Sequence, residues 1–194
     1  SVSKKEVAPV SMMPPGLTAM LRKDELLDLV RFLSELGKEG DFKVSSGRLA
    51  RRWRVIAADD QLSKRVNRAG LKKFLGSGSK LPWSPAFSMV SGELPLADMA
   101  VHRSGDDNLS FACVEVDVSV AGEIGFRMDN PRGLKLSLNG DVFVAQDELA
   151  RELGVGLHKV IVIVDRDARL QGGLRLELFD VAGSRGRAGF VTGY

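Results

Sequence analysis

The residues best suited to ligate a metal lie near the start of the chain, where Met12 and Met13 run into Pro14 and Pro15. A thioether is a soft, neutral ligand, and its established use in proteins is the axial bond to haem iron. Pro14 restricts the backbone directly after Met13 and would present the sulfur from a fixed loop. Packing of the methionines into an apolar core is the alternative, and the residue types alone leave both interpretations open.

Most other combinations of residues that carry catalysis or bind metal are missing. Cys113 is the only cysteine, which excludes an internal disulfide, a cysteine-based zinc site and a C-x-x-C motif. Neither His102 nor His158 has a second ligand at zinc-binding spacing, and the acids at 106–107 lack the further oxygen ligands of a calcium loop. We therefore predict that the chain is not an enzyme, and keep a hydrolase with an unrecognised site as an alternative hypothesis.

A basic segment could bind a polyanion. The whole chain carries 28 Lys or Arg against 25 Asp or Glu, a net charge of +3, but residues 43–80 hold eleven of the cations and two of the acids. That segment is therefore +9 and the remainder −6. Clustered Lys and Arg are what nucleic-acid binding requires. Because no helix-turn-helix or RNA-binding sheet motif accompanies them, we predict a solvated basic face and keep a nucleic-acid-binding protein as the alternative.

Periodicity divides the elements that must position these residues into three regions. In residues 1–40, apolar positions spaced by three and four predict one amphipathic helix, which Gly37 ends. Residues 41–104 read as a mixed, basic connecting segment, with a helix starting at Asp59 or Asp60 and ending at Gly76. Residues 105–194 read as all-β. The predicted fold class is α+β, an N-terminal helical segment followed by an antiparallel, jelly-roll-like β-sandwich.

Within the β region, alternation and turn signals place the strands. "FACVEVDVSV" alternates valines with polar residues, and "HKVIVIVD" is apolar enough to be central in a sheet. Ala121-Gly122 is predicted to turn the chain, and Asn139-Gly140 is the strongest two-residue hairpin signal. "DELARELGVG" is predicted to be a connection with at most one helical turn. No run of 18 apolar residues occurs, so no membrane span is expected.

The stretch "SMMPPGLTAMLRKDELLDLVRFLSELGKEG", residues 11–40, resembles the C-terminal end of a small c-type cytochrome domain. The form is that of large secreted, planctomycete-type haem-binding and membrane-bound dehydrogenase-like proteins, in which a Met-Pro-x-Gly-Leu loop precedes a closing helix. The following "RRWRV" and "SGELPL" are similar to those proteins, and "NPRGLKLSLNGD" with "GLHKVIVIVDR" resembles PA14-like and lectin-like β-sandwiches.

The resemblance implies that Met13 corresponds to the axial haem ligand and Met12 to its neighbour. The family attaches haem through C-x-x-C-H, which this sequence lacks, so haem c is expected only in a longer parent chain and no cofactor in this one. Residues 105–194 are then expected to be a non-catalytic accessory module of a secreted or periplasmic electron-transfer protein. Its expected partners are the upstream haem domain and, by fold analogy, carbohydrate or a protein; nucleic acid is not expected.

Overall fold

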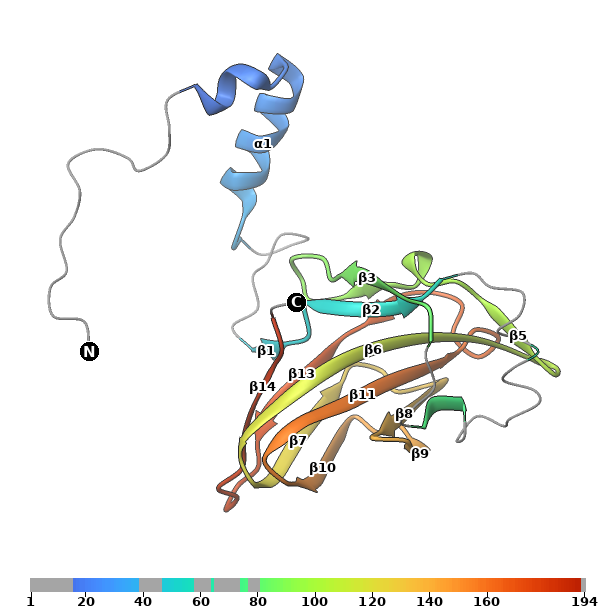
Figure 1. The fold of residues 1–194 in the computed structure, drawn as a ribbon. Helices are drawn as coiled ribbons and strands as arrows, with labels where there is room; N and C mark the ends of the chain where they lie inside the picture. The colour runs from blue at the N-terminus through green and yellow to red at the C-terminus, as the bar shows by residue number, and fades with distance from the viewer. Residues whose placement is uncertain (1–15, 39–46, 58–63, 65–73, 77–80, 193–194) are drawn as a thin grey trace, which may run out of the picture. The chain divides into compact units, whose positions relative to one another are not determined.

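The chain divides into two units, Ser1–Val44 and Ser45–Tyr194. The computed structural model describes residues 16–38, 47–57, 64, 74–76 and 81–192 (Figure 1). Met12 and Met13 lie outside the described residues, so the predicted axial ligand stays a prediction.

The described part of the first unit is a short 3₁₀ helix, η1 (Leu17–Met20), followed by α1 (Lys23–Glu35). The start of the helix is capped, because the Glu25 carboxylate accepts a 2.8 Å hydrogen bond from the Arg22 amide. It ends at Glu35, and Gly37 two residues later has a φ of 85°, the left-handed conformation typical of a helix stop. The predicted helix is thus confirmed. No residue of α1 is buried, and the apolar stripe is exposed. The exposed fraction of Leu33, for example, is 57%.

The second unit consists mainly of antiparallel strands in two large sheets (Figure 1). The eight-stranded sheet contains β3 (Trp83–Phe87), β2 (Arg52–Ile56), β6 (Asp107–Val120), β11 (Gly156–Asp165), β8 (Leu134–Leu138) and β9 (Asp141–Val144) in this order, and β5 (His102–Ser104) and β14 (Arg187–Phe190) also pair with β6. The four-stranded sheet has the order β1 (Arg48–Leu49), β13 (Leu176–Asp180), β7 (Gly122–Met128) and β10 (Glu148–Leu153). A small pair, β4 (Leu94–Pro95) and β12 (Gly173–Leu174), flanks the 3₁₀ helix η2 (Leu96–Asp98).

The long strands β6 and β11 organise this unit, and Figure 1 shows them running side by side along its length. β11 lies between β6 and β8, which confirms its predicted central place. Alternate side chains of the eight-stranded sheet, such as Val114 and Val162, pack with Phe126 and Leu176 of the four-stranded sheet in one core. The antiparallel β-rich architecture predicted from the sequence is therefore confirmed.

A second apolar cluster covers the other face of the eight-stranded sheet. Phe74 and Leu75 are buried there against Phe111, Cys113 and Ile161, and the Phe74 and Phe111 rings lie 5.8 Å apart. Most of the helix predicted to end at Gly76 lies outside the described residues. The described residues at its end, Phe74 and Leu75, nevertheless cover this face of the sheet, which explains why β6 and β11 are apolar on both faces.

Two predicted turns have different outcomes. Asn139 and Gly140 have φ values of 52° and 102° and join β8 to β9, so the predicted hairpin is confirmed. The chain also turns at Ala121-Gly122, but β6 and β7 do not pair with each other, because the turn carries the chain from one sheet to the other. Gly122 has a φ of 150°, and a Cβ there would lie 2.6 Å from the Gly186 amide nitrogen.

One secondary-structure prediction was wrong. Residues 148–153, expected as a connection, form β10 and pair with all of β7 except its last residue. Their burial supplies the reason, since Leu149 and Leu153 point into the shared core. The strands β1, β2 and β5 of the predicted connecting segment 41–104 also pair with strands that follow it, and β3 pairs with β2. In the described part of the chain, no helix is both long and apolar enough to cross a membrane.

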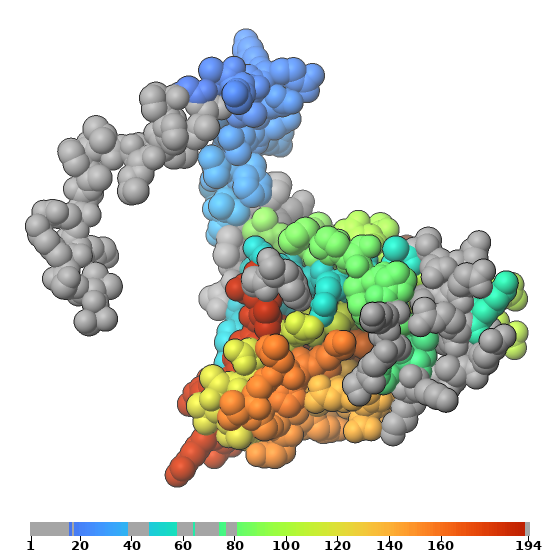
Figure 2. Space-filling view, viewed as in Figure 1, coloured from blue at the N-terminus to red at the C-terminus, as the bar shows by residue number. Residues whose placement is uncertain are grey.

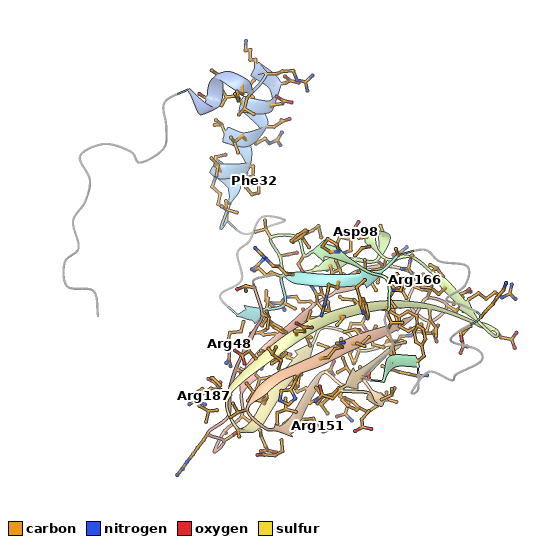
Figure 3. The ribbon with its side chains drawn as sticks, viewed as in Figure 1. Phe32, Arg48, Asp98, Arg151, Arg166 and Arg187 are labelled. Atoms are coloured by element: carbon orange, nitrogen blue, oxygen red, sulfur yellow. The ribbon has the colours of Figure 1, made fainter. Side chains whose placement is uncertain are left out.

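The first and last strands of the unit lie next to each other. The Arg48 guanidinium of β1 donates a 3.2 Å hydrogen bond to the Ala188 carbonyl of β14. It also forms an ion pair with Asp180 at 2.7 Å. Figure 3 shows Arg48 and Arg187 near the same border of the unit.

Candidate functional site

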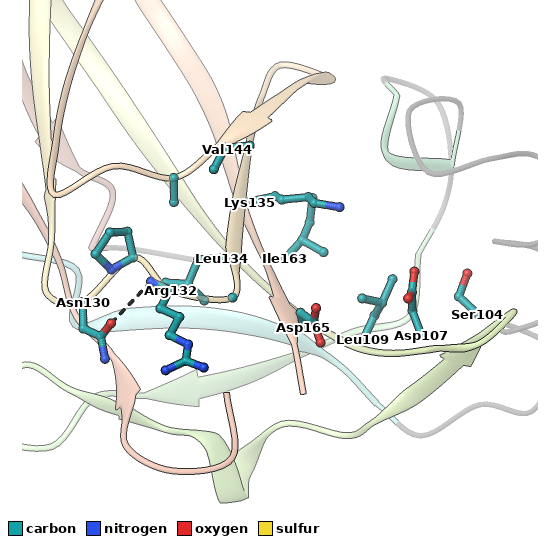
Figure 4. A pocket seen from close by; sticks show the side chains of 13 residues that line it. Ser104, Asp107, Leu109, Asn130, Arg132, Leu134, Lys135, Val144, Ile163 and Asp165 are labelled. Atoms are coloured by element: carbon teal, nitrogen blue, oxygen red, sulfur yellow. Dashed lines mark hydrogen bonds between the residues drawn. The ribbon is translucent and has the colours of Figure 1, made fainter. Parts of the chain in front are cut away.

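A cleft of about 870 Å³ opens beside the second apolar cluster, at the end of the strands β6, β11 and β8 (Figure 4). Its floor is apolar, with Leu109 of β6 and Ile163 of β11. Strand register brings its parts together, because Leu109 pairs with Asp165, and Ile163 pairs with Lys135. Lys135 in turn pairs with Val144 of β9, so four neighbouring strands contribute to one cleft.

The turn between β7 and β8 forms one wall of the cleft. Asn130 and Gly133 there have φ values of 51° and 69°, left-handed conformations that asparagine and glycine adopt readily. The Arg169 guanidinium holds this turn, because it donates hydrogen bonds to the Asn130 carbonyl at 2.5 Å and to the Gly173 carbonyl at 2.6 Å. The Asp165 amide adds a 2.8 Å hydrogen bond to the Gly133 carbonyl. Hydrogen bonds from two other segments therefore hold the backbone of this wall.

Arg169 is unusual because it is a buried cation bonded to carbonyl groups rather than to a carboxylate. Only 8% of its surface is exposed. Burial lowers the pKa of this guanidinium, and the negative charge of Glu93 acts in the opposite direction. An arginine stays protonated nonetheless, so Arg169 places a permanent positive charge behind the turn.

Charges of both signs line the cleft without neutralising each other. Arg132 and Lys135 lie on the β8 side, and Asp107 lies across the opening with Ser104 (Figure 4). Among the described residues, none of Arg132, Lys135 and Asp107 forms an ion pair. Asp165 is different, because its Oδ1 accepts hydrogen bonds from the amides of Asp167 and Ala168 at 3.0 and 3.1 Å. It therefore holds a turn and has less capacity left for a ligand.

Neither histidine joins the cleft. The ring of His158 is held at both nitrogens, by the Gly154 carbonyl at 2.7 Å and by the Asn139 amide group at 2.9 Å. His102 is buried, and its Nε2 lies 3.4 Å from the Ile56 carbonyl. The hydrolase alternative would be favoured by a histidine among carboxylates, and the described part of the chain does not bring His158 to such a site.

Cys113 is also unsuited to chemistry. Its side chain is fully buried, and this burial raises the pKa of its thiol to about 11. Arg54 and Lys159 favour the thiolate, but their effect is smaller than that of burial. The reactive species of a cysteine is the thiolate, so Cys113 has the properties of a packed core residue.

Most described arginines of the basic segment contact other parts of the unit. Arg48 pairs with Asp180, and Arg51 donates to the Val90 carbonyl at 2.9 Å. Arg54 forms a partly buried ion pair with Glu115 of β6. Six further cations, at positions 43, 65, 68, 72, 73 and 80, lie outside the described residues. Arg48, Arg51 and Arg54 are thus engaged in contacts within the unit, whereas Arg52 is exposed, and this weakens the case for a polyanion-binding surface.

The outer face of the four-stranded sheet is a contrasting surface. Its charged side chains pair across strands, as Arg127 does with Glu148 at 2.8 Å and Arg175 does with Asp129 at 2.7 Å. The Phe179 ring lies over Gly125, where a Cβ would be 2.6–2.7 Å from ring atoms. The hydrogen bond from Arg127 to Glu148 raises the pKa of this guanidinium above its ordinary value. The arginines of this face are paired with carboxylates, whereas Glu123 and Glu152, which lie opposite each other on β7 and β10, form no ion pair with a described residue.

The described residues do not fit a covalently attached haem. The family attaches haem through two cysteines and a histidine, whereas Cys113 is buried and the imidazole of His158 is hydrogen-bonded at both nitrogens. The described part of the chain also contains no group of three or more His, Cys, Asp or Glu side chains placed to hold a metal ion. The exposed apolar stripe of α1 could cover an apolar partner, but it supplies no ligand.

No known family model matches the sequence, and no curated protein or solved structure shows significant similarity to it. The site must therefore be interpreted from its own geometry.

Sequence reasoning missed the cleft. Its residues come from positions 104 to 165 and meet only through the pairing of β11 with β6 and β8. One signal was available, because Asn130-Pro131-Arg132-Gly133 has the composition of a turn between two strands. Such a turn, with an arginine next to an alternating strand, can form one wall of a cleft. The residues of the opposite wall cannot be identified without knowing the register of β11 with β6 and β8.

Proposed function

We propose that Ser45–Tyr194 is a non-catalytic binding module and that it holds a segment of a polypeptide partner in the cleft. The observation that carries this proposal is the combination of an apolar floor with Arg132, Lys135 and Asp107 unpaired among the described residues. Binding sites for organic ligands are typically apolar hollows with a few polar groups that fix orientation. A polypeptide offers both kinds of group, since its side chains can fill the floor while its charges meet the walls.

The lining of the cleft favours a polypeptide over the other expected ligands. Carbohydrate recognition by an apolar surface relies on aromatic rings, and no aromatic side chain of the described residues lines this cleft. Nucleic acid is disfavoured because Asp107 and Asp165 would lie close to phosphate groups. The outer face of the four-stranded sheet does carry an aromatic ring, but the Arg127 guanidinium lies 4.9 Å from its centroid.

We further propose that the module has the β-sandwich architecture, jelly-roll-like, and belongs to a longer secreted or periplasmic protein that carries haem c upstream. Support for the first part is the core shared by the two large sheets. Support for the second is the resemblance of residues 11–40 to the end of a c-type cytochrome domain. The haem domain of that parent is the first polypeptide partner to test. A visible absorption spectrum of the parent should show the Soret band of haem c, and its absence would contradict this part of the proposal.

An NMR titration of residues 45–194 tests the binding function. The probes are capped pentapeptides of the form acetyl-Thr-Val-X-Val-Thr-amide, with X as Glu, Lys, Leu or Ser, and separately cellohexaose and maltohexaose. We expect millimolar peptide to shift the backbone resonances of Leu109, Gly133, Lys135 and Ala145. Shifts of these resonances by a saccharide and not by any peptide would overturn the proposal, as would the absence of shifts with every probe.

A further inference from the structure

The strand β9 leaves one edge of the eight-stranded sheet open. Leu138 and Asp141 flank the two-residue turn, and the Ala145 amide donates to the Leu134 carbonyl at 3.1 Å. Leu138–Asp141 and Leu134–Ala145 are thus hydrogen-bonded pairs of the β8–β9 ladder. Because hydrogen-bonded and non-hydrogen-bonded pairs alternate in an antiparallel ladder, the amide and carbonyl groups of Val142 and Val144 point away from β8. In the described part of the chain no strand pairs with that side of β9, and Val144 is 70% exposed. Residues 140–165, in orange, make up much of the visible surface in Figure 2.

The opposite edge of the same sheet is closed by a proline. In β3, the Ser88 amide donates to the Arg51 carbonyl at 3.0 Å, so alternation directs the main-chain groups of Phe87 and Pro85 outward. Pro85 has no amide hydrogen, and a proline at such a position is a common protection against unwanted strand pairing. The sheet therefore blocks one of its edges and leaves open the edge that borders the cleft.

We infer that the open edge and the cleft act together: an extended segment of the polypeptide partner adds to β9 as a further strand and directs an acidic side chain toward Lys135. This inference rests on the proposed function and specifies its binding mode. In strand addition, main-chain hydrogen bonds supply affinity and pockets beside the strand select side chains. β9 supplies both parts, because Val144 belongs to the edge and also lines the cleft.

The expected charge follows from the register. One row of paired residues crosses three strands, because Ile163 of β11 pairs with Lys135 of β8, and Lys135 pairs with Val144 of β9. A residue added beside Val144 would continue this row. Lys135 is its nearest charged neighbour in the row, is exposed, and forms no ion pair with a described residue. A glutamate at the added position would reach it across Val144. A lysine there would meet like charge from both Lys135 and Arg132.

The test measures dissociation constants of two capped pentapeptides, acetyl-Thr-Val-Glu-Val-Thr-amide and its Lys analogue, by NMR titration of residues 45–194. Wild-type protein should prefer the Glu peptide, and Lys135→Glu should reverse the preference by about tenfold or more, the factor that 1.4 kcal/mol represents. Val144→Pro should weaken binding of both peptides, because it removes an outward amide and no ladder bond. The matched control is Phe87→Pro, the same change at an outward position of β3, which should leave binding unchanged.

A second set of probes does not depend on the folding of any variant. Methylation of the Glu amide nitrogen in the Glu peptide removes the main-chain donor that an added antiparallel strand would direct at the Val144 carbonyl, and it keeps every side chain. We expect the methylated peptide to lose binding. Equal binding of the methylated peptide, with shifts still at the cleft, would overturn strand addition and leave the proposed function standing. Absence of cleft shifts with every peptide would overturn both.

Discussion

On the outer face of the four-stranded sheet, arginines are paired with carboxylates, whereas in the cleft of the eight-stranded sheet charges of both signs stay apart. Arg127 and Arg175 reach carboxylates on neighbouring strands of the first surface. Arg132 and Lys135 have no such partner among the described residues, although Asp107 lines the same hollow. The two surfaces use the same residue types, so the difference teaches that a candidate site is recognised by charges that the fold leaves uncompensated.

The strongest test of this comparison concerns what holds the cleft open. Arg169→Met would leave the carbonyl groups of Asn130 and Gly173 without their donor in a buried place. We expect the free energy of unfolding to fall by about 2–4 kcal/mol, measured by urea denaturation. The control on the other sheet is Arg48→Met, which breaks an exposed ion pair with Asp180 and should cost about 1 kcal/mol or less. Equal losses in the two variants would remove the distinction.

The exclusion of water from the second apolar cluster should be visible in the pH dependence of stability. The pKa of Cys113 is about 11 in the folded protein, against an ordinary value of 9.0. The folded state holds this proton more tightly, so stability from Cys113 is complete below pH 9.0 and is lost as pH rises through about 11. The loss should amount to about 2–3 kcal/mol.

The measurement is the free energy of unfolding at a series of alkaline pH values, compared between the wild type and Cys113→Ala. The alanine variant is less stable throughout, but its curve should lack the part of the decline that belongs to the thiol. Parallel curves would show that the thiol titrates as it does in the unfolded chain, and that the second apolar cluster admits water.

A smaller effect is expected for the aromatic ring on the four-stranded sheet. Phe179→Ala removes the half-buried ring that covers Gly125 and faces the Arg127 guanidinium. We expect a loss of about 1–2 kcal/mol in thermal or urea unfolding. Phe179→Leu should recover part of it by covering the glycine. If the alanine variant is as stable as the wild type, the ring is available for another role, and this face would become the better candidate for carbohydrate.

The smallest effect should come from the cleft charges themselves. Lys135→Gln should change the free energy of unfolding by less than about 0.5 kcal/mol, because the ammonium forms no ion pair with a described residue that the change could remove. Asp129→Asn on the other sheet should cost up to about 1 kcal/mol, and this cost should shrink at high salt as the Arg175 pair is screened. A larger, salt-sensitive loss for Lys135→Gln would mean that its charge is already used within the protein.

The strands that the sequence predicts best are those in which local pattern and burial agree. The alternating valines of β6, the apolar β11 and the Asn139-Gly140 hairpin were all predicted, because period-two patterns and turn residues act locally. β10 was missed because Glu, Leu, Ala and Arg favour helices as isolated residues. Pairing with β7 and burial of Leu149 and Leu153 override that preference.

The cleft could not be predicted for a different reason. Asp107, Arg132 and Asp165 are far apart in the chain, and each is unremarkable in its own sequence context. Their proximity depends on the register of three strands, and on Arg169, whose partners are backbone carbonyls that leave no trace in a motif. Site prediction from sequence works where the residues are neighbours in the chain, and here they are neighbours only across a sheet.

The contact between Arg48 of β1 and Ala188 of β14 has a consequence for how this unit can be combined with others. Both ends of the folded unit meet at one corner, while the open edge of β9 belongs to the far side of the eight-stranded sheet. A polypeptide that carries the unit between two further domains would leave and resume its course at nearly the same point. The unit could then be inserted into a host protein without separating the domains on either side of it. The open edge of β9 would point away from the point of insertion.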